Sequence, residues 1–300
     1  MQADVLRVPA GPGAMHVERY GHGGTPVVLL HGFGTCTFLW RYVAPLLAEA
    51  GHTAYAVDLF GHGESDRTPD ADLGIAAQAE YLDAAMTALR VARAVIVGND
   101  LGGDVALRLA ATRPERVQKL VLINTPAFDE LPARDIATLQ RSTARFAFQV
   151  TRGVLGAAAL LQAILEASVV KPSEHMPARL LARYLAPFAG HDGVNHLLTL
   201  GAAIRRSDID DLALDDVTVP TLVVRGDRDE WLSRDIADRL AKTLPNARLA
   251  RVHGVARLIP EEAPEQLTEL LLDFISGPQE SPSNSTNTTE VTTTNGSQVG

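Results

Sequence analysis

A carboxylate lies at a predicted strand-to-helix turn, in the stretch Gly98-Asn99-Asp100-Leu101-Gly102. The apolar run AVIVG precedes the turn, and a helix is predicted from Leu101 to Thr112. A turn that lifts one side chain out of a sheet strains that residue and needs small neighbours, which Gly98 and Gly102 provide. Helix N-terminal N–H groups stabilise negative charge there. Because an aspartate is already ionised at neutral pH, Asp100 can attack carbon without a base to activate it.

The turn is one of several strand ends in a repeating pattern. Short apolar runs alternate with helical segments, and these runs cover Val27–Gly32, Thr53–Gly63, Ala94–Gly98, Lys119–Thr125, Thr221–Asp227 and Ala247–Val252. Strands that are apolar on both faces are typical of parallel sheets covered on both sides. The sequence therefore predicts an α/β fold with a mostly parallel central sheet flanked by helices.

The alternation stops between about Ala127 and Leu214, where the pattern is helical only. We expect a helical cap there, inserted after the sixth strand and lying over one edge of the sheet. The predicted organisation is a core of residues 1–126 and 215–276, a cap of 127–214 and a polar tail of 277–300. The tail has no apolar periodicity and is predicted to be disordered.

Charge and composition exclude several partners. A formal net charge of −9 argues against nucleic acid. The apolar segment Gly153–Val170 is interrupted by Gln162 and Glu166, which favours a buried helix of a soluble protein over a membrane span. The N-terminus lacks a signal-peptide pattern, and a lone Cys36 suits a reducing compartment, so a cytoplasmic protein is expected. We expect no cofactor or metal, a small-molecule substrate, and a monomer or homodimer.

These motifs together resemble the α/β-hydrolase family over roughly Val27 to Ile275. The resemblance rests on HGFG (His31–Gly34), DLFGHGESD (Asp58–Asp66), GNDLGG (Gly98–Gly103), VPTLVVRGDRD (Val219–Asp229) and GVARLIPEEAPE (Gly254–Glu265). An aspartate at the turn is similar to the branch of haloalkane dehalogenases and epoxide hydrolases, in which it attacks an sp3 carbon. The predicted cap is similar to the cap domain of that branch.

The resemblance implies roles for further residues. Asp100 would be the nucleophile, and the N–H groups of Phe33 and Leu101 would form an oxyanion hole. Asp229 matches the usual acid of the triad. His31, Asp58 and His62 are expected to support loops rather than to take part in chemistry.

The family pattern fails at its histidine. In the stretch from Gly254 to Pro264 the position of the family's base holds Arg257, which cannot accept a proton near neutral pH. Arg257 is expected to lie between Asp100 and Asp229 and to pair with both. Alternatively, it binds a substrate carboxylate or stabilises developing negative charge.

Other residues are candidates to replace the missing histidine or to contact the substrate. His253 is an alternative base, although four residues can span roughly 13 Å. His175, His191 and His196 of the cap are further candidates that are more typical of surface or core positions. Tyr184 is the one tyrosine of the cap and is a candidate contact to an epoxide oxygen, whereas Leu101 has no side-chain donor to hold a halide.

Three functions remain open from the sequence. The first is a hydrolase that uses an aspartate nucleophile on a small, mostly apolar molecule, impaired in its hydrolytic half-reaction. The second is a catalytically silent member that binds a small ligand, which the missing histidine supports. The third is a non-hydrolytic lyase that uses the Asp100/Arg257 pair in a different way.

Overall fold

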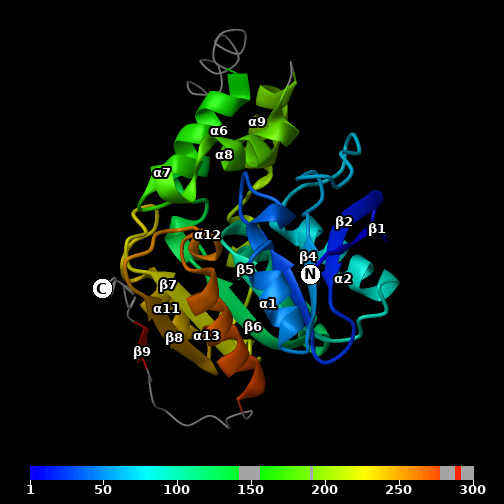
Figure 1. Cartoon of the computed structure of the whole chain (residues 1–300), viewed down its shortest axis with the longest axis vertical. Coiled ribbons are helices and arrows are strands. Elements are labelled where there is room, and N and C mark those ends of the chain that lie inside the picture. The colour runs from blue at the N-terminus through cyan, green and yellow to red at the C-terminus, as the bar shows by residue number, and fades with distance from the viewer. Residues whose placement is uncertain (142–155, 190–191, 278–287, 292–300) are drawn as a thin grey trace, which may run out of the picture.

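A single sheet organises the chain. The computed structural model describes residues 1–141, 156–189, 192–277 and 288–291. Within them, nine strands form a sheet of order β1-β2-β4-β3-β5-β6-β7-β8-β9 (Figure 1). They are β1 (Asp4–Ala10), β2 (Gly13–Tyr20), β3 (Pro26–Leu30), β4 (Thr53–Val57), β5 (Ala94–Asn99), β6 (Val117–Ile123), β7 (Thr221–Gly226), β8 (Ala247–Val252) and β9 (Thr288–Val291).

The predicted fold class is confirmed. All strand pairs from β4 through β3 to β9 are parallel, and every residue of β5 and β7 is buried. Helix α1 packs against α13 and helix α2 against α3, which covers the sheet on both sides. The core helices are α1 (Val43–Glu49), α2 (Ile75–Ala88), α3 (Leu101–Thr112), α11 (Ile236–Thr243), α12 (Ile259–Glu262) and α13 (Pro264–Ser276).

A helical insert separates β6 from β7, as the sequence predicted. Its described helices are η3 (Phe128–Glu130), α4 (Arg134–Gln140), α6 (Gly156–Glu166), α7 (Pro172–His175), α8 (Ala178–Leu185), η4 (Ala186–Phe188), α9 (Gly193–Ala203), α10 (Ser207–Asp210) and η5 (Leu214–Asp216). Figure 1 shows α6, α8 and α9 together beyond one end of the sheet. The boundary residues of core, cap and tail stay predictions.

The two ends of the chain add strands that the sequence pattern did not indicate. Strands β1 and β2 form an antiparallel hairpin that pairs through β2 with β4. In the predicted tail, β9 lies parallel to β8, and residues 278–287 and 292–300 are outside the described part of the chain. None of the described helices is long and apolar enough to cross a membrane.

Candidate active site

The turn between β5 and α3 has the strained conformation that the sequence predicted. Asp100 has φ 51° and ψ −122°, a region that residues with side chains rarely adopt. A Cβ atom at Gly98 would lie 2.2 Å from the carbonyl oxygen of Gly102, and one at Gly32 would lie 2.8 Å from the Cβ of Asp100. Glycine is therefore required at these positions, because any side chain would collide with the turn.

The Asp100 carboxylate is buried and has a partner on each oxygen. The Phe33 N–H donates to Oδ2 over 2.9 Å, and the Arg257 guanidinium donates from Nη2 to Oδ1 over 2.5 Å. Leu101 is the first residue of α3, so its N–H belongs to the helix start, where intrahelical acceptors are lacking. The Phe33 N–H thus contacts the carboxylate, and the role of Phe33 and Leu101 in an oxyanion hole stays a prediction.

Arg257 is a buried cation among several carboxylates. Its guanidinium pairs with Asp100 and, from Nη1, with Asp135 Oδ2 at 3.1 Å, and it lies 5.6 Å from the ring centre of Trp231. Burial lowers the pKa of Arg257, but the carboxylates of Asp100, Asp135 and Asp229 outweigh burial and hold it above its ordinary value. The side chain therefore stays charged and can act as a hydrogen-bond donor but not as a base.

The loop that carries Arg257 is fixed by its main chain. The side-chain amides of Asn99 and Asn124 donate to the Arg257 carbonyl over 3.3 and 3.1 Å. The Arg257 N–H donates to the carbonyl of Ser168 in the insert over 3.1 Å. Strands β5 and β6 and the insert thus set the position of residue 257 independently of its side chain.

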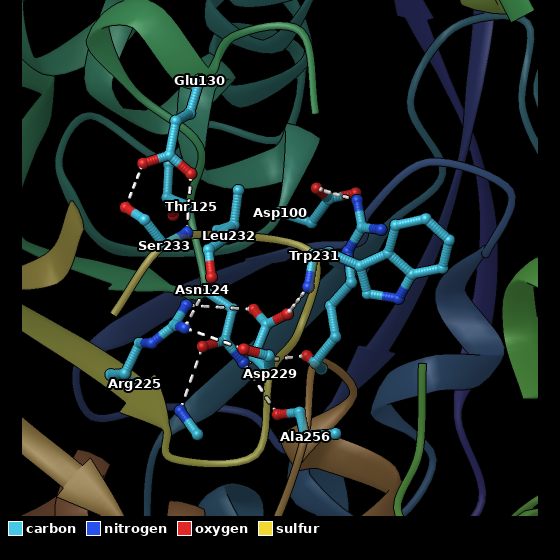
Figure 2. A network of polar contacts seen from close by, with 12 residues as sticks. Asp100, Asn124, Thr125, Glu130, Arg225, Asp229, Trp231, Leu232, Ser233 and Ala256 are labelled. Atoms are coloured by element: carbon cyan, nitrogen blue, oxygen red, sulfur yellow. Dashed lines mark hydrogen bonds and ion pairs between the residues drawn. The ribbon is translucent and has the colours of Figure 1, made fainter. Parts of the chain in front are cut away.

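The second carboxylate paired with Arg257 differs from the expected one. The sequence predicted pairing with Asp229, but the Asp229 carboxylate accepts from Arg225 at 3.2 Å and from the Trp231 N–H at 2.8 Å. Figure 2 shows the Asp229 carboxylate between these two groups. Asp135 is the partner because α4 of the insert brings it against the guanidinium. Asp229 acts on Arg257 through space only.

Asp229 is a fixed, buried carboxylate close to the site. Arg225 also donates to the carbonyls of Asp229 and Leu232, which holds the turn after β7 (Figure 2). Burial raises the pKa of Asp229, whereas the guanidinium groups of Arg257 and Arg225 oppose this rise. The carboxylate is suited to orient a neighbouring donor, because two donors already define its rotamer.

A family comparison agrees with this architecture. The model of the alpha/beta hydrolase fold family matches residues 25–264, most of the chain.

The chain belongs to the α/β-hydrolase fold family.

Similar proteins place this α/β hydrolase among enzymes of the superfamily. The uncharacterized hydrolase YugF of Bacillus subtilis is 27% identical, over 87% of this chain and 94% of its own. A haloalkane dehalogenase of Bradyrhizobium diazoefficiens is 26% identical, over 92% of this chain and 96% of its own. The structure of the epoxide hydrolase CorEH has a TM-score of 0.79 at 22% identity, covering 92% of this chain and 99% of that one.

Three residues predicted to support loops in this α/β hydrolase do so. His31 is fully buried, accepts the Leu59 N–H at Nε2 and contacts the Gly32 carbonyl through Nδ1. Asp58 accepts the N–H groups of Thr37 and Glu64. His62 Nδ1 contacts the carbonyl of Phe60, and burial keeps the pKa of His62 well below its usual value. These contacts hold the loops that follow β3 and β4, within each loop and between the two.

The alternative base and the cap tyrosine are engaged elsewhere. His253 Nδ1 contacts Asp227 at 3.1 Å, at the end of β8. Tyr184 is buried in α8 and its hydroxyl donates to Glu261, which also pairs with Arg41. His196 contacts the carbonyl of Gly61. His175 ends α7, and His191 lies outside the described residues.

Two carboxylates near Asp100 were not predicted from the sequence. Asp135 follows no motif, so no signal pointed to it. Asp104 lies four residues after Asp100 on α3, a spacing that brings side chains together on one helical face. That spacing was available in the sequence. Among the described residues, no group of three or more His, Cys, Asp or Glu is arranged to hold a metal ion.

Glu262 connects the Arg257 loop to the insert, and its charge should make stability depend on pH. Its carboxylate accepts the Val170 N–H over 2.6 Å and the Ala256 N–H over 2.7 Å. Burial raises the pKa of Glu262 to about 7 from 4.5, although both N–H groups oppose this rise. A raised pKa in the folded state gives stability that is present below about pH 4.5 and is lost as the pH rises through about 7.

Glu262→Gln should therefore remove part of the pH dependence of unfolding. The free energy of unfolding of wild type, relative to the variant, should fall by on the order of 2 kcal/mol from pH 4.5 to pH 8. Urea unfolding across this range measures the difference. Glu269→Gln, on the exposed face of α13, is the matched control and should leave the profile unchanged. If the free energy of unfolding of wild type, relative to the variant, instead rose with pH, the predicted direction of the effect would be wrong.

Proposed function

We propose that this α/β hydrolase acts on a small, mostly apolar molecule through nucleophilic attack by Asp100. The observation that carries the proposal is the Asp100 carboxylate itself. It lies in a strained turn at the start of α3, with the Phe33 N–H on Oδ2. An ionised carboxylate displaces a leaving group from an sp3 carbon and becomes a neutral alkyl ester. No base is needed for this first step.

The second half-reaction is the slow one in this proposal. Water must attack the ester carbonyl, and the resulting oxyanion would be stabilised by the N–H groups of Phe33 and Leu101. Within the described part of the chain, the Asp100 carboxylate contacts the Phe33 N–H and the Arg257 guanidinium. Neither of these groups can act as a base. General-base assistance typically contributes about 10²–10⁴ in rate, so a site without the family's histidine should hydrolyse its ester more slowly than a site that has it.

The substrate class follows from the residues around the carboxylate. Leu101 offers no side-chain donor to a halide, and the Tyr184 hydroxyl is committed to Glu261. The site therefore favours substrates whose leaving group needs little help, such as reactive primary alkyl bromides or terminal epoxides. Relatives named haloalkane dehalogenase and epoxide hydrolase support the same range.

Labelling by a reactive substrate tests the nucleophile. Incubation with a primary alkyl bromide should increase the protein mass by one alkyl group, and Asp100→Asn should abolish the increase. Peptide mapping should place the group on Asp100. Asp70→Asn is the control, because Asp70 is exposed and has φ 64°, which asparagine tolerates. Equal labelling of wild type and Asp100→Asn would contradict the proposal.

A second candidate is a ligand-binding protein without turnover. It is favoured by the pairing of Arg257 with Oδ1, which reduces the nucleophilicity of Asp100. Under this alternative, epoxides and bromides would leave the mass unchanged, while an unreactive analogue would still raise the melting temperature of the protein.

A further inference from the structure

Asp104 is a buried carboxyl group without a partner, close to the proposed nucleophile. It lies one turn into α3, and its N–H contacts the Asp100 carbonyl at 3.4 Å. The residue is 0% exposed, and within the described part of the chain neither of its side-chain oxygens has a hydrogen-bond partner. Burying a polar group without a partner is costly, so such a group calls for an explanation.

We propose that Asp104 is the general base of the second half-reaction, in the place where the family has a histidine. This proposal rests on the proposed function, because a general base is needed only after Asp100 has been alkylated and its ester must be hydrolysed. Its geometric support is the position of Asp104 one turn after Asp100, the absence of a hydrogen-bond partner for the Asp104 carboxyl among the described residues, and the Arg257 guanidinium on the Asp100 carboxylate.

The charges around Asp104 change in the direction that the reaction needs. In the resting protein, burial raises the pKa of Asp104 well above its usual range, the Asp100 carboxylate raises it further and Arg257 lowers it. Asp104 therefore starts protonated. Alkylation turns Asp100 into a neutral ester, which removes the repulsion, while the attraction to Arg257 remains. The pKa of Asp104 therefore falls when Asp100 is alkylated, which favours loss of its proton at the stage when a base is required.

The proposed cycle balances for an alkyl halide. Asp100 forms a bond to carbon, halide leaves with the bonding pair, and Asp104 releases its proton to solvent. Ionised Asp104 then takes a proton from water, and the hydroxide adds to the ester carbonyl. The tetrahedral intermediate expels the alkoxide, which receives that proton from Asp104. The new carboxylic acid of Asp100 returns its proton to Asp104, so the net products are alcohol, halide and one proton.

Asp104→Asn separates the two half-reactions. Asparagine has nearly the same shape and cannot take a proton. We expect adduct formation with the alkyl bromide at a rate within a few-fold of wild type. The decay of the purified adduct, followed by intact mass, should be slower by 10²-fold or more. In H₂¹⁸O the wild-type cycle should place ¹⁸O in the Asp100 carboxylate, and the variant should incorporate it correspondingly more slowly.

A second variant tests the same role by rescue. Asp104→Ala leaves space for a small acid, so formate should accelerate adduct decay in this variant and not in wild type. A merely structural role would give neither slower decay in Asp104→Asn nor rescue by formate.

The outcomes separate this inference from the proposed function. If the Asp104→Asn adduct decays as fast as that of wild type, or if formate leaves the Asp104→Ala adduct unchanged, Asp104 is not the base, while the Asp100 nucleophile stands. If wild type forms no adduct at all, the proposed function and the role of Asp104 both fall.

Discussion

Arg257→Met is expected to lower the free energy of unfolding by about 3–5 kcal/mol, the cost of removing one partner from a buried ion pair. The guanidinium is 3% exposed and pairs with Asp100 and Asp135, which are themselves buried. Methionine fills much of the volume but leaves two buried carboxylates without their cation. Urea unfolding at pH 7 measures the change.

The control for this loss is an arginine in an exposed pair. Arg19 donates to Asp4 at 2.8 Å near the surface, so Arg19→Met should cost about 1 kcal/mol or less. Comparable losses for the two variants would mean that water reaches Asp100 and Asp135 readily. In that case the site is wetter than its burial indicates, and Arg257 contributes little to the fold.

The elements around Asp100 were predictable because their constraints are local. Gly98 is dictated by close contact with the main chain of Gly102 and Gly103 within the turn, and the helix predicted from Leu101 to Thr112 has its observed bounds. The parallel strands were visible as short apolar runs. The hairpin β1–β2 was not, because the edge strand β1 buries only two of its seven residues and has a weak apolar signal.

The partner of Arg257 could not be read from the sequence. Which carboxylate meets the guanidinium depends on how α4 of the insert packs on the core, and that contact joins residues 122 positions apart. Arg225 is a second case that the apolar pattern does not reveal, although its acceptors lie only four and seven residues away. It lies in the apolar strand β7 and is buried because Asp229 and two carbonyls accept its donors. Only the folded chain brings these groups together.

The charges of Asp100, Asp104 and Arg257 together predict slow hydrolysis of the ester rather than none. Arg257 holds one oxygen of the nucleophile and stays charged throughout, so it stabilises anions but moves no proton. Proton transfer is then left to Asp104, the buried carboxyl group whose pKa depends on the charge of Asp100. A base at residue 257 would act independently of that coupling.

Arg257→His is therefore expected to raise turnover of a reactive alkyl bromide by about 10-fold or more, because an imidazole accepts a proton at neutral pH more readily than the buried Asp104 carboxyl, and a general base contributes about 10²–10⁴ in total. The main chain at residue 257 is held by Asn99, Asn124 and Ser168 rather than by the guanidinium, so a histidine should keep the position of the loop. We propose that Asp229 then orients the imidazole, as in triad chemistry. Steady-state release of bromide measures the gain.

Two comparisons decide whether the gain comes from a base. Arg257→Gln also frees Asp100 from its ion pair but cannot accept a proton, so it should accelerate labelling without the full gain in turnover. Adding Asp229→Asn to Arg257→His should remove most of the gain, whereas adding Asp104→Asn should not, because the imidazole takes over the proton. If Arg257→Gln turns over as fast as Arg257→His, release of the nucleophile limits the wild-type enzyme, and the lack of a histidine does not.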